Sequence, residues 1–182
     1  MQGFLYQYTN REVYIMKNKF IFLLAVIVFA GCSDSTSTVE NEIDVLLAEV
    51  RNATQSYSNI DNAIAAGWDT PLSPCVVHPQ LGGMGYHYAR LEFFDGRTNH
   101  LEPQVLLYEP LENGSLAFVG VEYIIPFDIV PSDAAAPVIF DQTYHPNHEL
   151  EIWALHVWTE KENPSGIFSD FNQNVSCEFA ND

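Results

Sequence analysis

An Asn-Gly pair between two alternating apolar runs is the strongest constraint on the fold of this chain. The runs are Val105–Tyr108 and Leu116–Ile125, and Asn113-Gly114 lies between them. Asn-Gly in this setting is the strongest short-range signal for a β-hairpin, because both residues tolerate the positive φ angles of a tight turn. With a two-residue turn at this pair, we expect Val105 to lie opposite Glu122 in the neighbouring strand.

The rest of the chain predicts one helical stretch and two further long strands around this hairpin. Apolar residues recur at helical spacing from an Asn41 cap to Gly67, and residues 56–59 could divide the stretch into two helices. Strands are predicted at Met84–Phe94 and Leu150–Thr159, and loops at residues 68–83 and 127–149. This order predicts an α+β fold, in which the amphipathic N-terminal helix packs on an antiparallel β-sheet. A small β-barrel is the alternative.

A short apolar run near the start of the chain predicts export. Lys17 and Lys19 precede the run, which ends at Ala30 and Gly31 directly before Cys32. A charged start, a short apolar centre and a small-residue exit are typical of a secretory signal peptide, and the run is shorter than the roughly 20 residues that span a bilayer. We therefore predict a signal peptide over residues 1–31, with Met16 as the true start.

The end of this run resembles the lipobox of bacterial lipoproteins. The residues are Val28-Phe29-Ala30-Gly31-Cys32, with Phe29 where that family prefers Leu, and ordinary signal-peptide cleavage near Ala30 is the alternative. The resemblance implies that Cys32 carries lipid and becomes the N-terminus. The protein would then be held at the bacterial cell envelope by its lipid anchor only, exposed to the periplasm or the cell surface. Residues 32–40 are predicted to be a flexible tether, and residues 41–182 a single domain.

The charge of the chain argues against one class of partner. The formal net charge is −17, and the signal peptide carries more cations than anions, so the mature chain is more acidic still. Its fixed cations are Arg51, Arg90, Arg97 and Lys161. Such a surface repels phosphate backbones, which argues against nucleic-acid binding, and it attracts divalent cations or cationic ligands. The simpler explanation of the acidity is that it keeps an exported protein soluble.

Two cysteines, Cys75 and Cys177, remain once Cys32 is lipidated. An exported chain folds where disulfides persist, and two cysteines allow only one pairing. We therefore predict a structural disulfide between them. The pairing would also leave Cys75 unable to act as a nucleophile beside His78.

Three polar residues, His87, Glu122 and His156, lie inside predicted strands. Side chains alternate along a strand, so each of the three shares a face with apolar or small residues and needs a polar partner there. Two neutral imidazoles and a carboxylate could hold a divalent transition metal with positions left open, and no other cofactor is indicated. The competing interpretation is a buried hydrogen-bonded group that orders the core and binds nothing.

Two other sets of residues are weaker candidates. Glu109 is predicted opposite Phe118, too far along the hairpin from Glu122 to share an ion with it. The run His145-Pro146-Asn147-His148-Glu149, with Asp141 and Glu151 nearby, has metal-binding residue types. It lies in a predicted loop without fixed geometry, so a solvated loop is the favoured interpretation.

Several short motifs of the chain resemble a group of uncharacterised exported bacterial proteins. They are Gly82-Gly83-Met84-Gly85-Tyr86-His87-Tyr88, Leu106-Leu107-Tyr108-Glu109-Pro110, Val121-Glu122-Tyr123, Leu155-His156-Val157-Trp158, Asn163-Pro164-Ser165-Gly166 and Ser176-Cys177. The resemblance implies a shared fold and no particular activity. Our leading hypothesis is a lipid-anchored envelope protein that binds a small molecule or a protein partner. The alternative is a metal-dependent enzyme that uses His87, Glu122 and His156.

Overall fold

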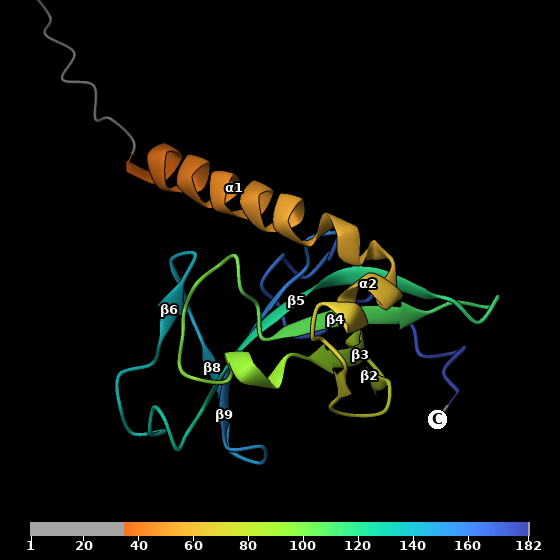
Figure 1. The fold of residues 1–182 in the computed structure, drawn as a ribbon. Helices are drawn as coiled ribbons and strands as arrows, with labels where there is room; N and C mark the ends of the chain where they lie inside the picture. Colours follow the sequence, from red (N-terminus) through yellow and green to blue (C-terminus); the bar gives the residue numbers. More distant parts are fainter. Residues whose placement is uncertain (1–34, 182) are drawn as a thin grey trace, which may run out of the picture. The chain divides into compact units, whose positions relative to one another are not determined.

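The computed structural model describes residues 35–181, which begin with helix α1 (Ser35–Thr54), drawn in orange in Figure 1. The 3₁₀ turn η1 (Gln55–Ser58) and helix α2 (Ile60–Ala65) follow. The predicted division of the helical stretch is therefore confirmed, and the Asn59 side chain caps α2 by accepting a hydrogen bond from the backbone N–H of Asp61 at 3.0 Å. The start of α1 differs from the predicted Asn41, so residues 35–40 are helical rather than part of a tether. No Gly or Pro interrupts them, and a formed helix extends at little cost.

The predictions for the N-terminal region fall outside the described residues. They concern the signal peptide, the start at Met16 and the lipidation of Cys32. Within residues 35–181, no helix is long and apolar enough to cross a membrane.

Seven strands form one antiparallel sheet, in the order β1-β3-β4-β5-β9-β8, with β2 also paired to β3. Their bounds are β1 (Thr70–Pro71), β2 (Val76–His78), β3 (Gly82–Ala89), β4 (Val105–Pro110), β5 (Leu116–Pro126), β8 (His145–Asn147) and β9 (Ile152–Val157). Two short strands, β6 (Val138–Ile139) and β7 (Gln142–Thr143), pair with each other. The four long strands are present as predicted and confirm the α+β class, but the strand predicted at Met84–Phe94 ends at Ala89 and is followed by the 3₁₀ turn η2 (Leu91–Phe93). The short strands β1, β2 and β8 lie in segments that were predicted as loops.

The hairpin of β4 and β5 follows the predicted register over only half of its length. Val105 lies opposite Glu122 as predicted, and Leu107 lies opposite Gly120. A β-bulge then shifts the pairing, so Glu109 faces Ala117 rather than Phe118. The turn is also longer than the predicted two residues, because its hydrogen bonds join Leu111 to Gly114 and Ser115.

The sheet has one face under the helices and one face away from them. Leu47 and Val50 of α1 belong to the larger buried cluster, together with Leu106 and Tyr108 of β4, and Figure 1 shows α1 running along this side. The alternate β4 residues point the other way. They belong to a smaller buried cluster, which consists of Ala89, Val105, Leu107, Val119, Ile124, Trp158 and Val175. The candidate site lies on this second face.

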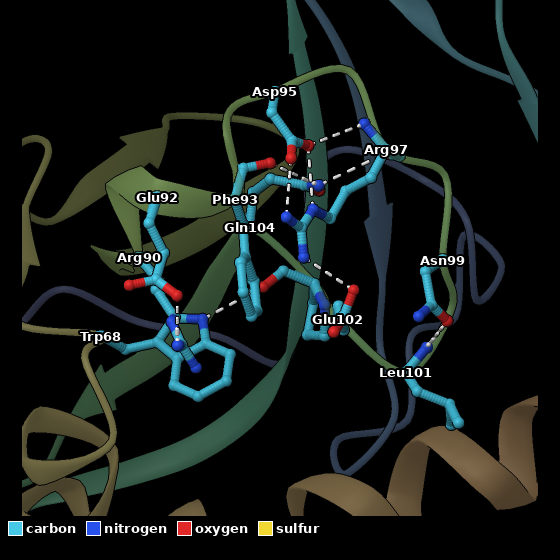
Figure 2. Close-up of polar contacts among 11 residues, drawn as sticks. Trp68, Arg90, Glu92, Phe93, Asp95, Arg97, Asn99, Leu101, Glu102 and Gln104 are labelled. Atoms are coloured by element: carbon cyan, nitrogen blue, oxygen red, sulfur yellow. Dashed lines mark hydrogen bonds and ion pairs between the residues drawn. The ribbon is translucent and has the colours of Figure 1, made fainter.

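An arginine–aromatic stack orders the loop between β3 and β4 (Figure 2). The guanidinium carbons of Arg90 and Arg97 lie 4.1 Å and 4.4 Å from the centre of the Phe93 ring. The Gln104 side chain is fully buried; it donates to the carbonyls of Phe93 and Arg97 and accepts a hydrogen bond from the backbone N–H of Ile124 at 3.0 Å. The loop is thereby attached to β5. Arg90 and Arg97, two of the permanently charged residues of the chain, make structural contacts here.

The C-terminal segment, which we define as residues 163–177, returns to the edge of β3. The backbones of Gly83 and Asn172 exchange two hydrogen bonds, of 3.1 Å and 3.0 Å. A Cβ atom at Gly82 would lie 2.2 Å from the Asn172 carbonyl oxygen, so this close approach requires glycine. Cys75 and Cys177 form a disulfide with Cα atoms 5.8 Å apart, which confirms the predicted pairing and holds the end of the segment.

Candidate metal centre

Three side chains from three strands converge on the face of the sheet that lies away from the helices. They are His87 on β3, Glu122 on β5 and His156 on β9, and all three are buried. His87 Nε2 lies 3.7 Å from Glu122 Oε2, and His156 Nε2 lies 3.6 Å from Glu122 Oε1. One ligand atom from each residue fits within 4.8 Å of the others. The three residues that sequence reasoning selected are therefore brought together, and we call them the trio.

The strand pairing explains how residues far apart in sequence meet. Glu122 and His156 lie directly opposite each other in the β5–β9 ladder. His87 lies one strand further away, opposite Leu107 on β4, and Leu107 in turn lies opposite Gly120 on β5. Gly120 is two residues from Glu122, so the trio occupies one face of three strands.

Gly120 also lets β9 approach closely. A Cβ atom at this position would lie 2.5 Å from the carbonyl oxygen of Val157, which directly follows His156. The Trp158 ring then stacks on His156, with the ring centres 6.2 Å apart. The two rings are nearly parallel, with an interplanar angle of 17°.

The trio is close, but its members do not hydrogen-bond to one another. The separations of 3.6 Å and 3.7 Å exceed hydrogen-bond length. Among the described residues, Glu122 Oε2 and His156 Nε2 are buried without any hydrogen-bond partner. Buried polar atoms are nearly always paired, and each unpaired one costs about 1–3 kcal/mol. The geometry therefore does not match a simple hydrogen-bonded group that only orders the core.

Burial shapes the protonation of the trio. Desolvation, reinforced by the nearby His156, lowers the pKa of His87 to about 3, so His87 is neutral at neutral pH. Desolvation raises the pKa of Glu122, although the charge of His156 opposes this shift. Burial also lowers the pKa of His156, but the carboxylates of Glu122 and Asp170 outweigh it and the net shift is upward. Glu122 and His156 therefore hold a proton more readily than the free side chains do, whereas His87 holds one less readily.

Asp170, from the C-terminal segment, is the site residue that sequence reasoning missed. Its Oδ1 atom lies 3.7 Å from His156 Nδ1 and 3.2 Å from His145 Nδ1. Interaction with His156 is the main reason why the pKa of Asp170 is lowered. The 3.7 Å separation exceeds hydrogen-bond length, and His156 Nδ1 has no hydrogen-bond partner among the described residues. At hydrogen-bond distance, a carboxylate in this position would orient the ring and make its other nitrogen a better ligand. Nothing local in the sequence signals this role, because Asp170 lies in an irregular segment.

The trio and the stretch around His145 and His148, which were separate candidates in the sequence, line the same cavity. It has a volume of about 530 Å³, and the trio lines it together with His145, His148 and Asp170. His145 and its neighbours are exposed and form β8, which pairs with β9, so this stretch has fixed backbone geometry where a solvated loop was predicted. Asp141 and Glu151 are not among the residues that line the cavity.

The contacts of Glu109 are with residues outside the trio. It is buried, it forms an ion pair with Lys161, and its Oε1 atom accepts a hydrogen bond from the backbone N–H of Ser176 at 2.9 Å. This contact adds a second attachment for the C-terminal segment beside the disulfide. Cys75 is disulfide-bonded, so it is not a nucleophile for His78.

No protein-family model matches the chain, and neither a curated protein nor a solved structure does. The two resemblances drawn from short motifs therefore stay expectations. The interpretation of the site rests on its geometry and its chemistry.

Proposed function

We propose that this chain is a lipid-anchored protein of the bacterial cell envelope that binds a small ligand at a divalent metal centre. His87, Glu122 and His156 are the metal ligands in this proposal, and the cavity beside them receives the ligand. The single observation that carries it is the convergence of three buried metal-binding side chains, in which two of the facing atoms, Glu122 Oε2 and His156 Nε2, have no hydrogen-bond partner among the described residues.

Distance supports the metal proposal. Two ligands bound to Zn²⁺ at about 2.1 Å in tetrahedral geometry lie about 3.4 Å apart. The two histidine-to-glutamate separations, 3.7 Å and 3.6 Å, exceed this value by only a few tenths of an ångström, although they end on different oxygens of Glu122. One ligand atom from each of the three residues lies within 4.8 Å of the others, so side-chain movements would have to bring the histidines closer together around the ion.

Charge and chemistry support it as well. The residues that line the cavity include the carboxylates of Glu122 and Asp170, and no Lys or Arg is among them. A buried carboxylate without a cation is costly, and a divalent ion beside Glu122 would relieve that cost. Two imidazoles and one carboxylate suit Zn²⁺ and similar transition metals, whereas Ca²⁺ prefers six to eight oxygen ligands.

Titration of the metal-free full chain with Zn²⁺, in detergent, tests the proposal by calorimetry and metal analysis. We expect about one Zn²⁺ per chain and little binding of Ca²⁺. His87→Ala, Glu122→Ala and His156→Ala should each weaken binding by more than about 100-fold, because even outer partners of a metal site are worth about 10–100-fold.

His148→Ala is the matched control, since His148 lines the same cavity, directly follows the exposed strand β8 and does not belong to the trio. We expect its affinity for Zn²⁺ to stay close to that of the unaltered chain. Substoichiometric binding, or an equal loss in His148→Ala and His87→Ala, would contradict the proposal.

Metal-dependent hydrolysis is the second candidate function. The observation that favours it is the number of protein ligands, because catalytic zinc sites use three and keep a position for water or substrate. All three members of the trio border the cavity, so a small substrate could reach such a position. Turnover of small esters by the zinc-loaded chain, absent in Glu122→Ala, would favour the enzyme over the binding protein.

A further inference from the structure

The cavity beside the trio has mostly apolar walls. Leu72, Val76, Met84, Ile124, Ile152 and Phe171 all line it. They come from the segment before β3, from β3, β5 and β9, and from the C-terminal segment, so the walls enclose a ligand from several sides. A volume of about 530 Å³ lies within the range of small-molecule sites, which is roughly 300–1,000 Å³. The size and the walls indicate a small molecule with an apolar body.

The charged groups of the cavity restrict the ligand further. Glu122 belongs to the trio, and Asp170 already faces two histidines, so neither carboxylate is free to bind a cationic group. No Lys or Arg lines the cavity, and its histidines lie in the trio or on the exposed side formed by residues 145–148. A second charged group deep in the apolar part of the cavity would lose its hydration without gaining a partner. A metal held by the trio is therefore the strongest partner that the site offers to a charged group.

We infer that the ligand is a small molecule with one metal-binding oxygen group at one end and an uncharged apolar body. The oxygen group, such as a carboxylate, binds the open position of the metal. The body packs against Ile124, Ile152 and the other apolar walls. This inference rests on the proposed function, because it requires the metal.

A series of straight-chain hydroxamates, from two to eight carbons, tests the inference on the zinc-loaded full chain. The hydroxamate head is the same throughout, so any trend reports the walls of the cavity. Affinity should rise by up to roughly fourfold per added methylene until the cavity is full. The eight-carbon compound with a terminal amine should bind at least about tenfold more weakly than its uncharged counterpart, because the amine must be desolvated.

Ala154→Leu probes the wall directly. Ala154 lines the cavity on β9, so a larger side chain there should shorten the longest hydroxamate that gains affinity. Ala117→Leu is the matched control, because Ala117 lies on β5 beside Glu109 and is not among the residues that line the cavity. The control should leave the series unchanged.

Metal content, measured on the same samples, distinguishes a failure of the inference from a failure of the proposed function. If zinc is bound stoichiometrically and affinity does not rise with chain length, the inference is overturned and the proposed function stands. If the aminated compound binds as well as its counterpart, the inference is also overturned. If the chain binds no zinc, both the proposed function and the inference are overturned.

Discussion

Glu122 is the residue on which the site depends most. Its carboxylate lies between His87 and His156, and Oε2 has no hydrogen-bond partner among residues 35–181. Burial raises its pKa, which means that the fold disfavours the ionised form. A residue kept only for stability would be hydrogen-bonded or apolar at this position. In our proposal, Glu122 therefore serves binding rather than folding.

Glu122→Met tests this view, since Met is similar in length and has no charge. In the presence of a chelator, we expect the free energy of unfolding to stay the same or to rise by up to about 2 kcal/mol, because an unpaired buried carboxylate is removed. Urea denaturation of both chains measures the difference. A loss of more than about 3 kcal/mol would indicate a structural ion pair instead. Gain of stability with loss of zinc binding would match the proposed function.

At the scale of elements, the C-terminal segment completes a site that the sheet alone would leave open. It carries Asp170 to His156 and Phe171 to the wall of the cavity. Its position depends on fully buried Asn172, whose side chain donates to the carbonyls of Lys161 and Glu162, and on the disulfide at Cys177. We therefore expect the stability of this segment and the affinity of the site for zinc to be linked.

Removal of the disulfide by Cys75→Ala with Cys177→Ala should lower the free energy of unfolding by about 2–5 kcal/mol. It should also weaken zinc binding, because the segment that carries Asp170 loses one attachment. Denaturation and zinc titration of the same sample measure both effects. Asp170→Asn is the comparison: we expect about 10–100-fold weaker zinc binding with little change in stability. Equal zinc affinity in the double cysteine variant and the unaltered chain would show that the segment and the site are independent.

At the scale of the whole molecule, the two faces of the sheet carry different parts of the structure. One face is covered by α1 and α2 and buries the larger cluster of the core. The other face holds the smaller cluster, the trio and the cavity. The predicted lipid anchor at Cys32 precedes α1 and lies outside the described residues. In our proposal the lipid holds the domain at the envelope, and the domain binds its ligand there.

Cys32→Ser tests the anchor. Lipidation requires the thiol, so the variant should leave the membrane fraction or stay unprocessed, and intact-mass spectrometry should find no lipid on it. Cys75→Ala is the matched cysteine control and should remain in the membrane fraction. An unlipidated N-terminus on the unaltered protein in the native envelope would rule out the anchor and favour ordinary cleavage near Ala30.

Local patterns in the sequence predicted the long strands of the sheet and three residues of the candidate site. Alternating apolar runs and the Asn113-Gly114 pair predicted the hairpin and placed Glu122 opposite Val105. The same alternation singled out His87, Glu122 and His156 as polar residues on apolar faces. These properties depend on neighbours along one strand, where periodicity and turn preference act directly.

Only the tertiary structure decided how those pieces meet. The bulge that moves Glu109 opposite Ala117 depends on packing across the hairpin, because an extra residue is accepted only where the surrounding side chains can accommodate it. Asp170 meets His156 and His145 through a segment without regular structure, and that segment is placed by a disulfide and by buried Asn172. Contacts of this kind join residues far apart in the chain. They form because the whole molecule buries its apolar surface in one arrangement, which no local pattern of residues records.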